Sequence, residues 1–164
     1  MSFGEEDMAN EIGIDNGIFG ETLDSNQLKS INTLGLAYVG DAVYELFVRI
    51  RLCKERGCTN STMHKQAVRR VNAAAQARAG ELLMSRLTDE EKDVCRRGRN
   101  TDYHSKPKNV SHADYAAATG FETLFGWLWM TGRQERAYEL FRFLWDHEPR
   151  DGGPAQMKGA GDGT

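Results

Sequence analysis

Three acidic side chains stand in the two most apolar stretches of the chain. Asp41 and Glu45 lie in the run LGLAYVGDAVYELFVRI, and Glu122 is the only acid in AAATGFETLFGWLW. A carboxylate in such a helix is costly unless it pairs with a cation or binds a metal ion. Carboxylates without His or Cys suit Mg²⁺ or Mn²⁺, whose shell is completed by waters and substrate phosphates. Such an ion can activate a water and stabilise charge on a phosphate, so the chemistry indicated is phosphodiester hydrolysis.

The spacing of these acids favours a shared site. Asp41 and Glu45 are four residues apart, so on a helix they lie on one face, about 6 Å apart along the axis. The face of Glu122 also carries Ala118, Thr119 and Gly126, which are small. Small neighbours leave room for a ligand to approach the carboxylate. An alternative remains open, in which each acid pairs with an arginine or caps a neighbouring helix.

Two basic segments favour a polyanionic partner. Residues 96–108 are expected to form an exposed, mobile loop, and His64, Lys65 and Arg69 form a second strip. No aromatic residues for base stacking are interleaved with these charges, which favours contact with the backbone of a duplex. Binding through phosphates should weaken steeply with salt. The alternative is a solvated loop without a ligand. The expected RNA-binding residues are Arg97, Arg99, Asn100, Lys106, Lys108, His64, Lys65 and Arg69.

The charge is unevenly distributed along the 164 residues. Residues 1–24 hold seven acids and no Lys or Arg, so we expect a flexible acidic segment. Residues 149–164 are Gly-rich with balanced charges, which is typical of a disordered tail. The remaining 25–148 form one expected domain with 19 basic and 15 acidic residues, which agrees with a polyanionic partner.

Helical patterns dominate this domain, so the predicted class is all-α with about six helices. A short helix begins at Asp24 or Ser25, and apolar spacing predicts a helix over 33–55. One Ala-rich helix is expected over 59–87. Thr88 with Glu91, and Ser111 with Asp114, indicate capping boxes for two further helices, and Gly132 precedes the last one.

Several classes of protein are disfavoured. No apolar run is free enough of charge to span a bilayer, and the N-terminus lacks the pattern of a secretory signal. The three cysteines, Cys53, Cys58 and Cys95, show no zinc or disulfide spacing. We therefore expect a cytoplasmic protein without membrane contact.

Four segments in order resemble a known family. They are LAYVGDAVYE, HKQAVRRVNAAAQA, RRGRN…PKN and ATGFETLFGWLW. GDAVYE resembles part of the ribonuclease III signature, and the ordered set over about 27–145 resembles Mini-ribonuclease III, its small bacterial form. In that resemblance Asp41 matches the catalytic Asp and Glu122 the metal-binding Glu. Ala37 and Thr119 stand where full-length ribonuclease III has two more acids, and Glu45 is either a supporting ligand or part of a salt bridge.

The resemblance implies a homodimeric, all-helical catalytic domain that cuts double-stranded RNA with Mg²⁺, with Mn²⁺ as a plausible substitute. It implies products with 5′-phosphate and 3′-hydroxyl ends and a role in maturing 23S ribosomal RNA precursors. It also implies that no separate double-stranded RNA-binding domain is present. A large-subunit ribosomal protein on the substrate is a further candidate partner. The apolar residues Leu36, Val39, Val43 and Phe47 belong either to the dimer interface or to the core.

Two other functions remain open at this point. The first is a non-catalytic double-stranded RNA-binding or ribosome-assembly module with the same fold. The second is an all-α dimeric interaction protein without an RNA role. Retention of both acids disfavours the first, and the basic segments disfavour the second.

Overall fold

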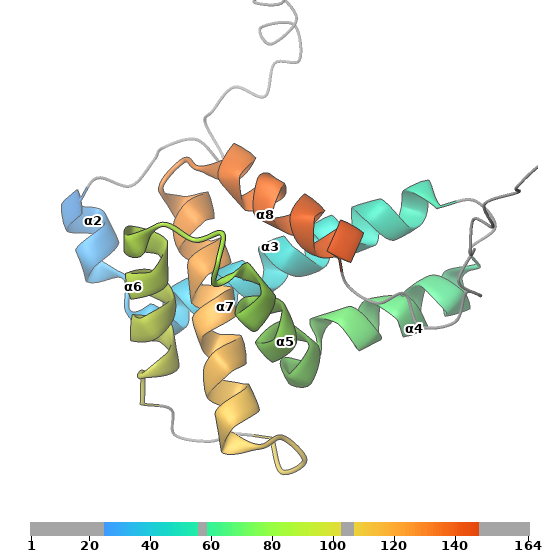
Figure 1. The fold of residues 1–164 in the computed structure, drawn as a ribbon, viewed down its shortest axis with the longest axis horizontal. Coiled ribbons are helices and arrows are strands. Elements are labelled where there is room, and N and C mark those ends of the chain that lie inside the picture. Colours follow the sequence, from blue (N-terminus) through green and yellow to red (C-terminus); the bar gives the residue numbers. More distant parts are fainter. Residues whose placement is uncertain (1–24, 56–58, 103–106, 148–164) are drawn as a thin grey trace, which may run out of the picture.

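The structure is a computed structural model that describes residues 25–55, 59–102 and 107–147, and within them the chain is all-α. The acidic segment 1–24 and the tail 149–164 lie outside these residues. The described part forms seven helices, one more than expected (Figure 1). They are α2 (Ser25–Ser30), α3 (Thr33–Lys54), α4 (Asn60–Val71), α5 (Ala73–Leu83), α6 (Asp89–Arg99), α7 (His112–Met130) and α8 (Gln134–His147).

The extra helix boundary is at Asn72, where a single helix was wrongly expected over 59–87. Asn72 has an extended backbone and ends α4 while it caps α5. Its Oδ1 accepts from the Ala75 N–H at 3.0 Å, and its Nδ2 donates to the carbonyls of Val68 and Arg69. One short amide side chain thus satisfies backbone groups of both helices, which makes the break stable.

The other helix boundaries largely follow the local signals. The helix expected over 33–55 is α3, and Asn32 caps it by accepting from the Gly35 N–H. Thr88 and Glu91 form the expected capping box of α6, with both bonds present. At the start of α7 the Ser111 hydroxyl accepts from the Asp114 N–H.

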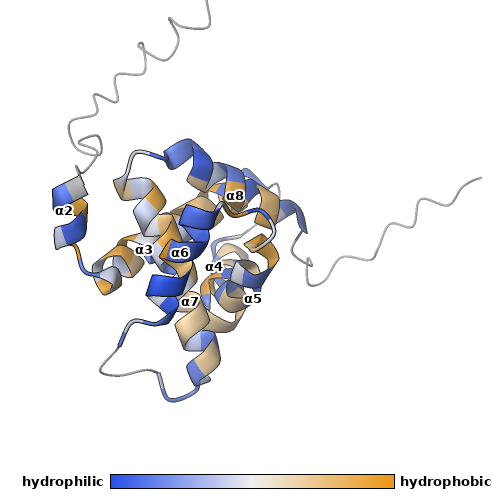
Figure 2. Cartoon of the chain, turned by 60° about the vertical axis from the view of Figure 1, so that its left-hand side comes forward, coloured by the Kyte–Doolittle hydropathy of each residue, from blue (hydrophilic) through white to orange (hydrophobic). Residues whose placement is uncertain are grey.

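Helix α7 is the centre of the fold, and α3 crosses it with the two backbones in contact. A Cβ added at Gly40 would overlap the carbonyl oxygen of Glu122, and one at Gly126 would overlap that of Leu36. Helices α5 and α6 pack on other sides of α7. Figure 2 shows α7 as largely apolar, with hydrophilic segments on α6 and α8 around it. No helix in the described ranges is long and apolar enough to cross a membrane.

The core is filled by apolar side chains from α3, α7 and α8. Tyr44 makes edge contacts with Phe121, Phe125 and Phe141, with ring centroids 4.8–6.0 Å apart. Leu36 and Val43, which the sequence left between core and interface, are buried within this single chain. Val39 and Phe47 are partly buried and pack against the same core.

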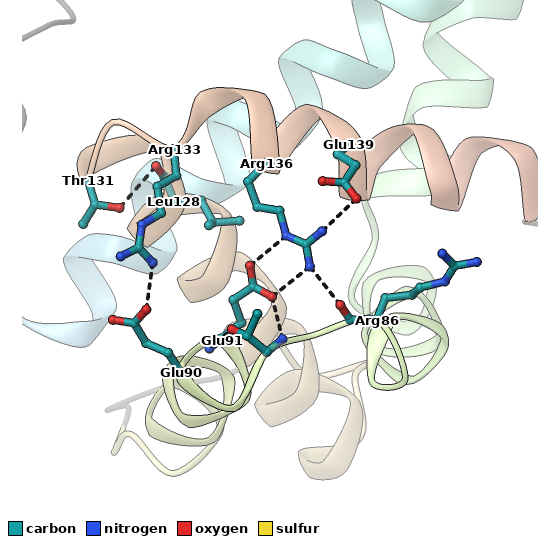
Figure 3. Close-up of polar contacts among 9 residues, drawn as sticks. Arg86, Glu90, Glu91, Leu128, Thr131, Arg133, Arg136 and Glu139 are labelled. Carbon is teal, nitrogen blue, oxygen red and sulfur yellow. Dashed lines mark hydrogen bonds and ion pairs between the residues drawn. The ribbon is translucent and has the colours of Figure 1, made fainter.

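Helices α6 and α8 are joined by a partly buried ion pair. Arg136 donates to Glu91 at 2.8 and 3.1 Å and to the Arg86 carbonyl, as Figure 3 shows. Burial alone would raise the pKa of Glu91, but hydrogen bonds from Arg136 and from Thr88 hold it below its ordinary value. Arg133, which directly precedes α8, and Glu90 of α6 form a second, more exposed pair. These contacts fix α6 against the core.

The contact between α3 and α7 predicts a strong effect of Gly126→Ala. A methyl group there has no space, so the helices must separate, which costs about 1–3 kcal/mol or more of unfolding free energy. Gly80→Ala is the matched control, because its Cβ would meet Phe121 at an ordinary 3.8 Å. Alanine at that helix position should stabilise by up to about 1 kcal/mol. Urea unfolding measures both variants, and equal stabilisation by the two would contradict direct backbone contact.

Candidate active site

Two of the three predicted acids meet beside a third polar group. Asp41 comes from α3 and Glu122 from α7, and the side chain of Gln76 from α5 lies against both. Gln76 Nε2 donates to Asp41 Oδ1 at 3.4 Å, and the same amide lies close enough to Glu122 to lower the pKa of that carboxyl. Both carboxylates are half-buried, whereas Gln76 is 1% exposed. The site therefore consists of two carboxylates held around one amide.

The crossing of α3 and α7 brings the two acids together. Gly40 precedes Asp41, and the place of its missing side chain is filled by the backbone carbonyl of Glu122 itself. The interpretation of Gly126 as room for a ligand was wrong, because the Leu36 carbonyl of α3 fills that space. Thr119 is buried and its hydroxyl donates to the Tyr115 carbonyl. The small residues of α7 therefore serve helix packing.

Burial and mutual repulsion dominate the electrostatics of the site. Burial, followed by the negative charge of Asp41, raises the pKa of Glu122 to about 8, against an opposing hydrogen bond from Gln76. Burial, followed by the charge of Glu45, also raises the pKa of Asp41. In the described part of the chain neither acid forms an ion pair with Lys or Arg. The two acids therefore lie together without a compensating cation from these residues, and both are harder to ionise than ordinary carboxyl groups.

Glu45 is directed to a different partner. Its Oε1 accepts from Arg49 at 2.6 Å, one helical turn away on α3. Across the described ranges no group of three or more His, Cys, Asp or Glu side chains lies close enough to hold a metal. The salt bridge that the sequence left as an alternative is thus formed, and a role of Glu45 as a ligand stays a prediction.

The basic segment after residue 95 begins inside a helix, because α6 continues to Arg99. Arg97 and Arg99 are exposed in the last turn of α6, and Asn100 caps it. The expected mobile loop is wrong for 96–99, because Gly98 is buried against Thr123 and Gly120 of α7. Lys108 is exposed just before α7, and Lys106 lies outside the described residues.

The second basic strip lies on α4, where His64, Lys65 and Arg69 are all exposed. Helix α4 packs on α3 and α5, whereas α6 packs mainly on α7. In Figure 1, α6 lies to the left of α7 and α4 lies to the right of α5. The basic groups therefore stand on two helices that lie to either side of α7 and α5 in this view.

Comparisons with known proteins agree with this arrangement. The model of the ribonuclease III domain family matches residues 34–133. A Mini-ribonuclease 3 of Symbiobacterium thermophilum is 48% identical over 66% of this chain and 84% of its own length. Those of Thermoanaerobacter sp. and Clostridium tetani are 40% and 39% identical and cover 71% and 76% of the chain, and 82% and 83% of their own lengths. The chain belongs to the ribonuclease III family, in its Mini-ribonuclease 3 group.

Family membership agrees with the fold and with the class of reaction. A solved structure of a protein from Fusobacterium nucleatum is similar with a TM-score of 0.66 at 24% identity, over 73% of this chain and 95% of that one. That likeness concerns the fold. As a ribonuclease III family member the chain is an endoribonuclease for double-stranded RNA. Asp41, Gln76 and Glu122 all fall within the matched family domain.

Gln76 is the site residue that sequence reasoning missed. It stands in the stretch NAAAQARA, in which the nearest polar neighbours are Asn72 and Arg78. An amide surrounded by alanines on an inward face needs a partner from another element. That signal was available, but it does not say which element supplies the partner.

The raised pKa of Glu122 predicts a pH-dependent gain in stability for Glu122→Gln in EDTA. In the folded chain Glu122 keeps its proton up to about pH 8, whereas its ordinary pKa is 4.5. Stability linked to this proton is therefore full below pH 4.5 and is lost as the pH rises through 8. The neutral variant lacks this loss, so its melting temperature should exceed that of the wild type by a margin that grows up to about pH 8.

The control is Glu81→Gln, which changes an exposed acid on α5. Its melting temperature should follow that of the wild type across the same pH range. A constant difference between Glu122→Gln and the wild type would show that burial does not shift the titration of this carboxyl.

Proposed function

We propose that this endoribonuclease hydrolyses double-stranded RNA with Mg²⁺, for which Mn²⁺ can substitute, held by Asp41 and Glu122. The observation that carries the proposal is the pair of half-buried carboxylates that converge on Gln76 without a cationic partner in the described residues. Glu45 supports the pair from the next turn of α3 through its negative charge.

The donor set fits a hard divalent cation. Two carboxylates supply oxygen ligands only, and Mg²⁺ is commonly held by one or two carboxylates together with waters and substrate phosphates. Their mutual repulsion, which contributes to the raised pKa of Glu122, is relieved when a cation binds between them. A zinc site would need His or Cys ligands, and the two nearest polar groups here are an amide and a salt-bridged glutamate.

In this proposal the acidic side chains bind the cation and the basic side chains bind the RNA. Asp41 and Glu122 hold the cation, which when bound supplies Lewis-acid stabilisation of the phosphate and an activated water. The basic residues hold the duplex by its phosphates on both sides of the acids. Cleavage leaves 5′-phosphate and 3′-hydroxyl ends. The phosphate contacts assigned to the chain are Arg97, Arg99, Asn100 and Lys108 on one side, and His64, Lys65 and Arg69 on the other. Lys106, which lies outside the described residues, is assigned to the same role from the sequence.

The active form in this proposal is a homodimer paired through α3. An exposed apolar stripe runs along this helix at intervals of four residues, and its large members are Leu34, Tyr38, Leu46 and Ile50, with Tyr38 83% exposed. Contiguous exposed apolar area of this kind is typical of a protein interface. A dimer with two-fold symmetry presents one site to each strand of an RNA duplex.

The biological substrate that we assign is the precursor of 23S ribosomal RNA in the cytoplasm. A large-subunit ribosomal protein bound to that precursor is the accompanying partner. Both assignments rest on the family resemblance of the four ordered motifs.

The apolar stripe predicts that Leu46→Glu dissociates the dimer. The side chain is 47% exposed in the single chain, so a charge is tolerated in the monomer but would be buried in the dimer. Sedimentation velocity should show a monomer where the wild type is dimeric. Leu82→Glu on α5, at 39% exposure, is the matched control and should stay dimeric. Dimeric Leu46→Glu would place the interface on another face.

The catalytic assignment predicts discrete cleavage of a long double-stranded RNA in Mg²⁺ and none in EDTA. Asp41→Asn and Glu122→Gln should each be at least about 100-fold slower, because a lost ligand removes several kcal/mol of transition-state stabilisation. Glu81→Gln should cleave like the wild type. Gel electrophoresis with 5′-end analysis measures the products. Tight RNA binding by the wild type without cleavage would favour the non-catalytic alternative.

A further inference from the structure

Gln76 differs from the other buried polar residues in the described part of the chain. Those are Glu91, Thr119 and Thr123. Glu91 is neutralised by Arg136, and each threonine hydroxyl donates to a carbonyl of its own helix at 2.6–2.9 Å. Gln76 instead directs its side chain from α5 to carboxylates on two other helices. Burying an amide is costly without such hydrogen bonds, so the burial of Gln76 depends on the two acids beside it.

The start of α5 fixes where this amide lies. Asn72 caps the helix, and the Gln76 N–H makes the first bond of the following turn to the Asn72 carbonyl at 2.9 Å. The residues on either side, Ala75 and Ala77, are small and buried, so α5 can pack closely on α7. The helix break at Asn72 therefore determines the position of the amide group.

The chemistry of an amide suits this position. A glutamine NH₂ has two N–H donors and carries no charge, so it can bond two carboxylates without neutralising either. A lysine or arginine there would pair with the acids and compete with a bound cation. The contact of 3.4 Å to Asp41 is long for an N–H···O bond, so it withdraws little charge from the carboxylate.

We propose that Gln76 is a positioning residue that holds Asp41 and Glu122 in place for a divalent cation through hydrogen bonds from its side-chain amide. This inference rests on the proposed function, because it concerns the same two acids. It assigns to α5 a role in metal binding that is exerted through other residues. Outer hydrogen-bond partners of this kind typically change metal affinity by 10–100-fold when removed.

The test is Mn²⁺ binding to the full chain after EDTA treatment, with free Mn²⁺ measured by electron paramagnetic resonance. Gln76→Met keeps the length of the side chain but lacks the N–H donors, and its affinity for Mn²⁺ should fall about 10–100-fold. The control is Gln134→Met, since Gln134 Nε2 donates to the Trp129 carbonyl at 3.2 Å and touches neither acid. Its affinity should match that of the wild type.

The possible results separate the two proposals. Unchanged or tighter Mn²⁺ binding by folded Gln76→Met would overturn the positioning role. If Asp41→Asn and Glu122→Gln bind Mn²⁺ as well as the wild type, the metal assignment itself fails. A second measurement needs no folded variant at position 76: the side-chain NH₂ resonances of Gln76 in the wild type should shift on addition of Mg²⁺. They should not shift in Asp41→Asn, and a lack of any shift in the wild type would also overturn the role.

Discussion

The site depends on the backbone contact between α3 and α7. Helices with ordinary side chains at the crossing stay 8–10 Å apart, whereas glycine at both contact points lets the backbones touch. Gly40 rests on the carbonyl of Glu122, and Gly126 rests on that of Leu36. Since Asp41 follows Gly40 directly, the contact that joins the helices also sets the two acids beside each other. No loop is involved, so the position of the acids is as rigid as the core.

This rigidity is maintained against electrostatic repulsion. Burial, and after it the negative charge of Asp41, disfavours the ionised form of Glu122, and the pKa of about 8 for Glu122 reflects both. The aromatic packing of Tyr44 on α7 and α8 lies close to the same crossing and stabilises it. The ion pair of Arg136 and Glu91 fixes α6, which carries the basic turn. The packing of the helices therefore holds the two acids together although burial and repulsion disfavour their ionised forms.

Features that depend on residues close together in the sequence could be predicted, whereas features that depend on contacts between distant helices could not. The fold class and most helix ends were predictable, and the acids Asp41 and Glu122 could be selected as candidates, because an acid in an apolar run and a capping residue are local signals. The break at Asn72 was missed because an Ala-rich pattern continues through it, and one side chain that caps two helices overrides helical propensity. Gly126 was misinterpreted and Gln76 overlooked, because both act through contacts between helices distant in the chain.

Helix α3 contacts α7, carries Asp41 and exposes an apolar stripe, and these three features lie on different faces of the helix. At about 100° per residue, Gly40 lies nearly opposite the centre of the exposed stripe near Ala42. Asp41 lies about 100° from that centre, at the edge between the buried face and the exposed face. This position explains why its carboxylate is half-buried, with Gln76 on one side and solvent on the other. A site at such an edge is open to solvent on one side while its side chains are still held by the core. Pairing of the stripe with a second copy would brace α3 from the side opposite α7, so that the interface and the acid pair depend on the same rigid helix.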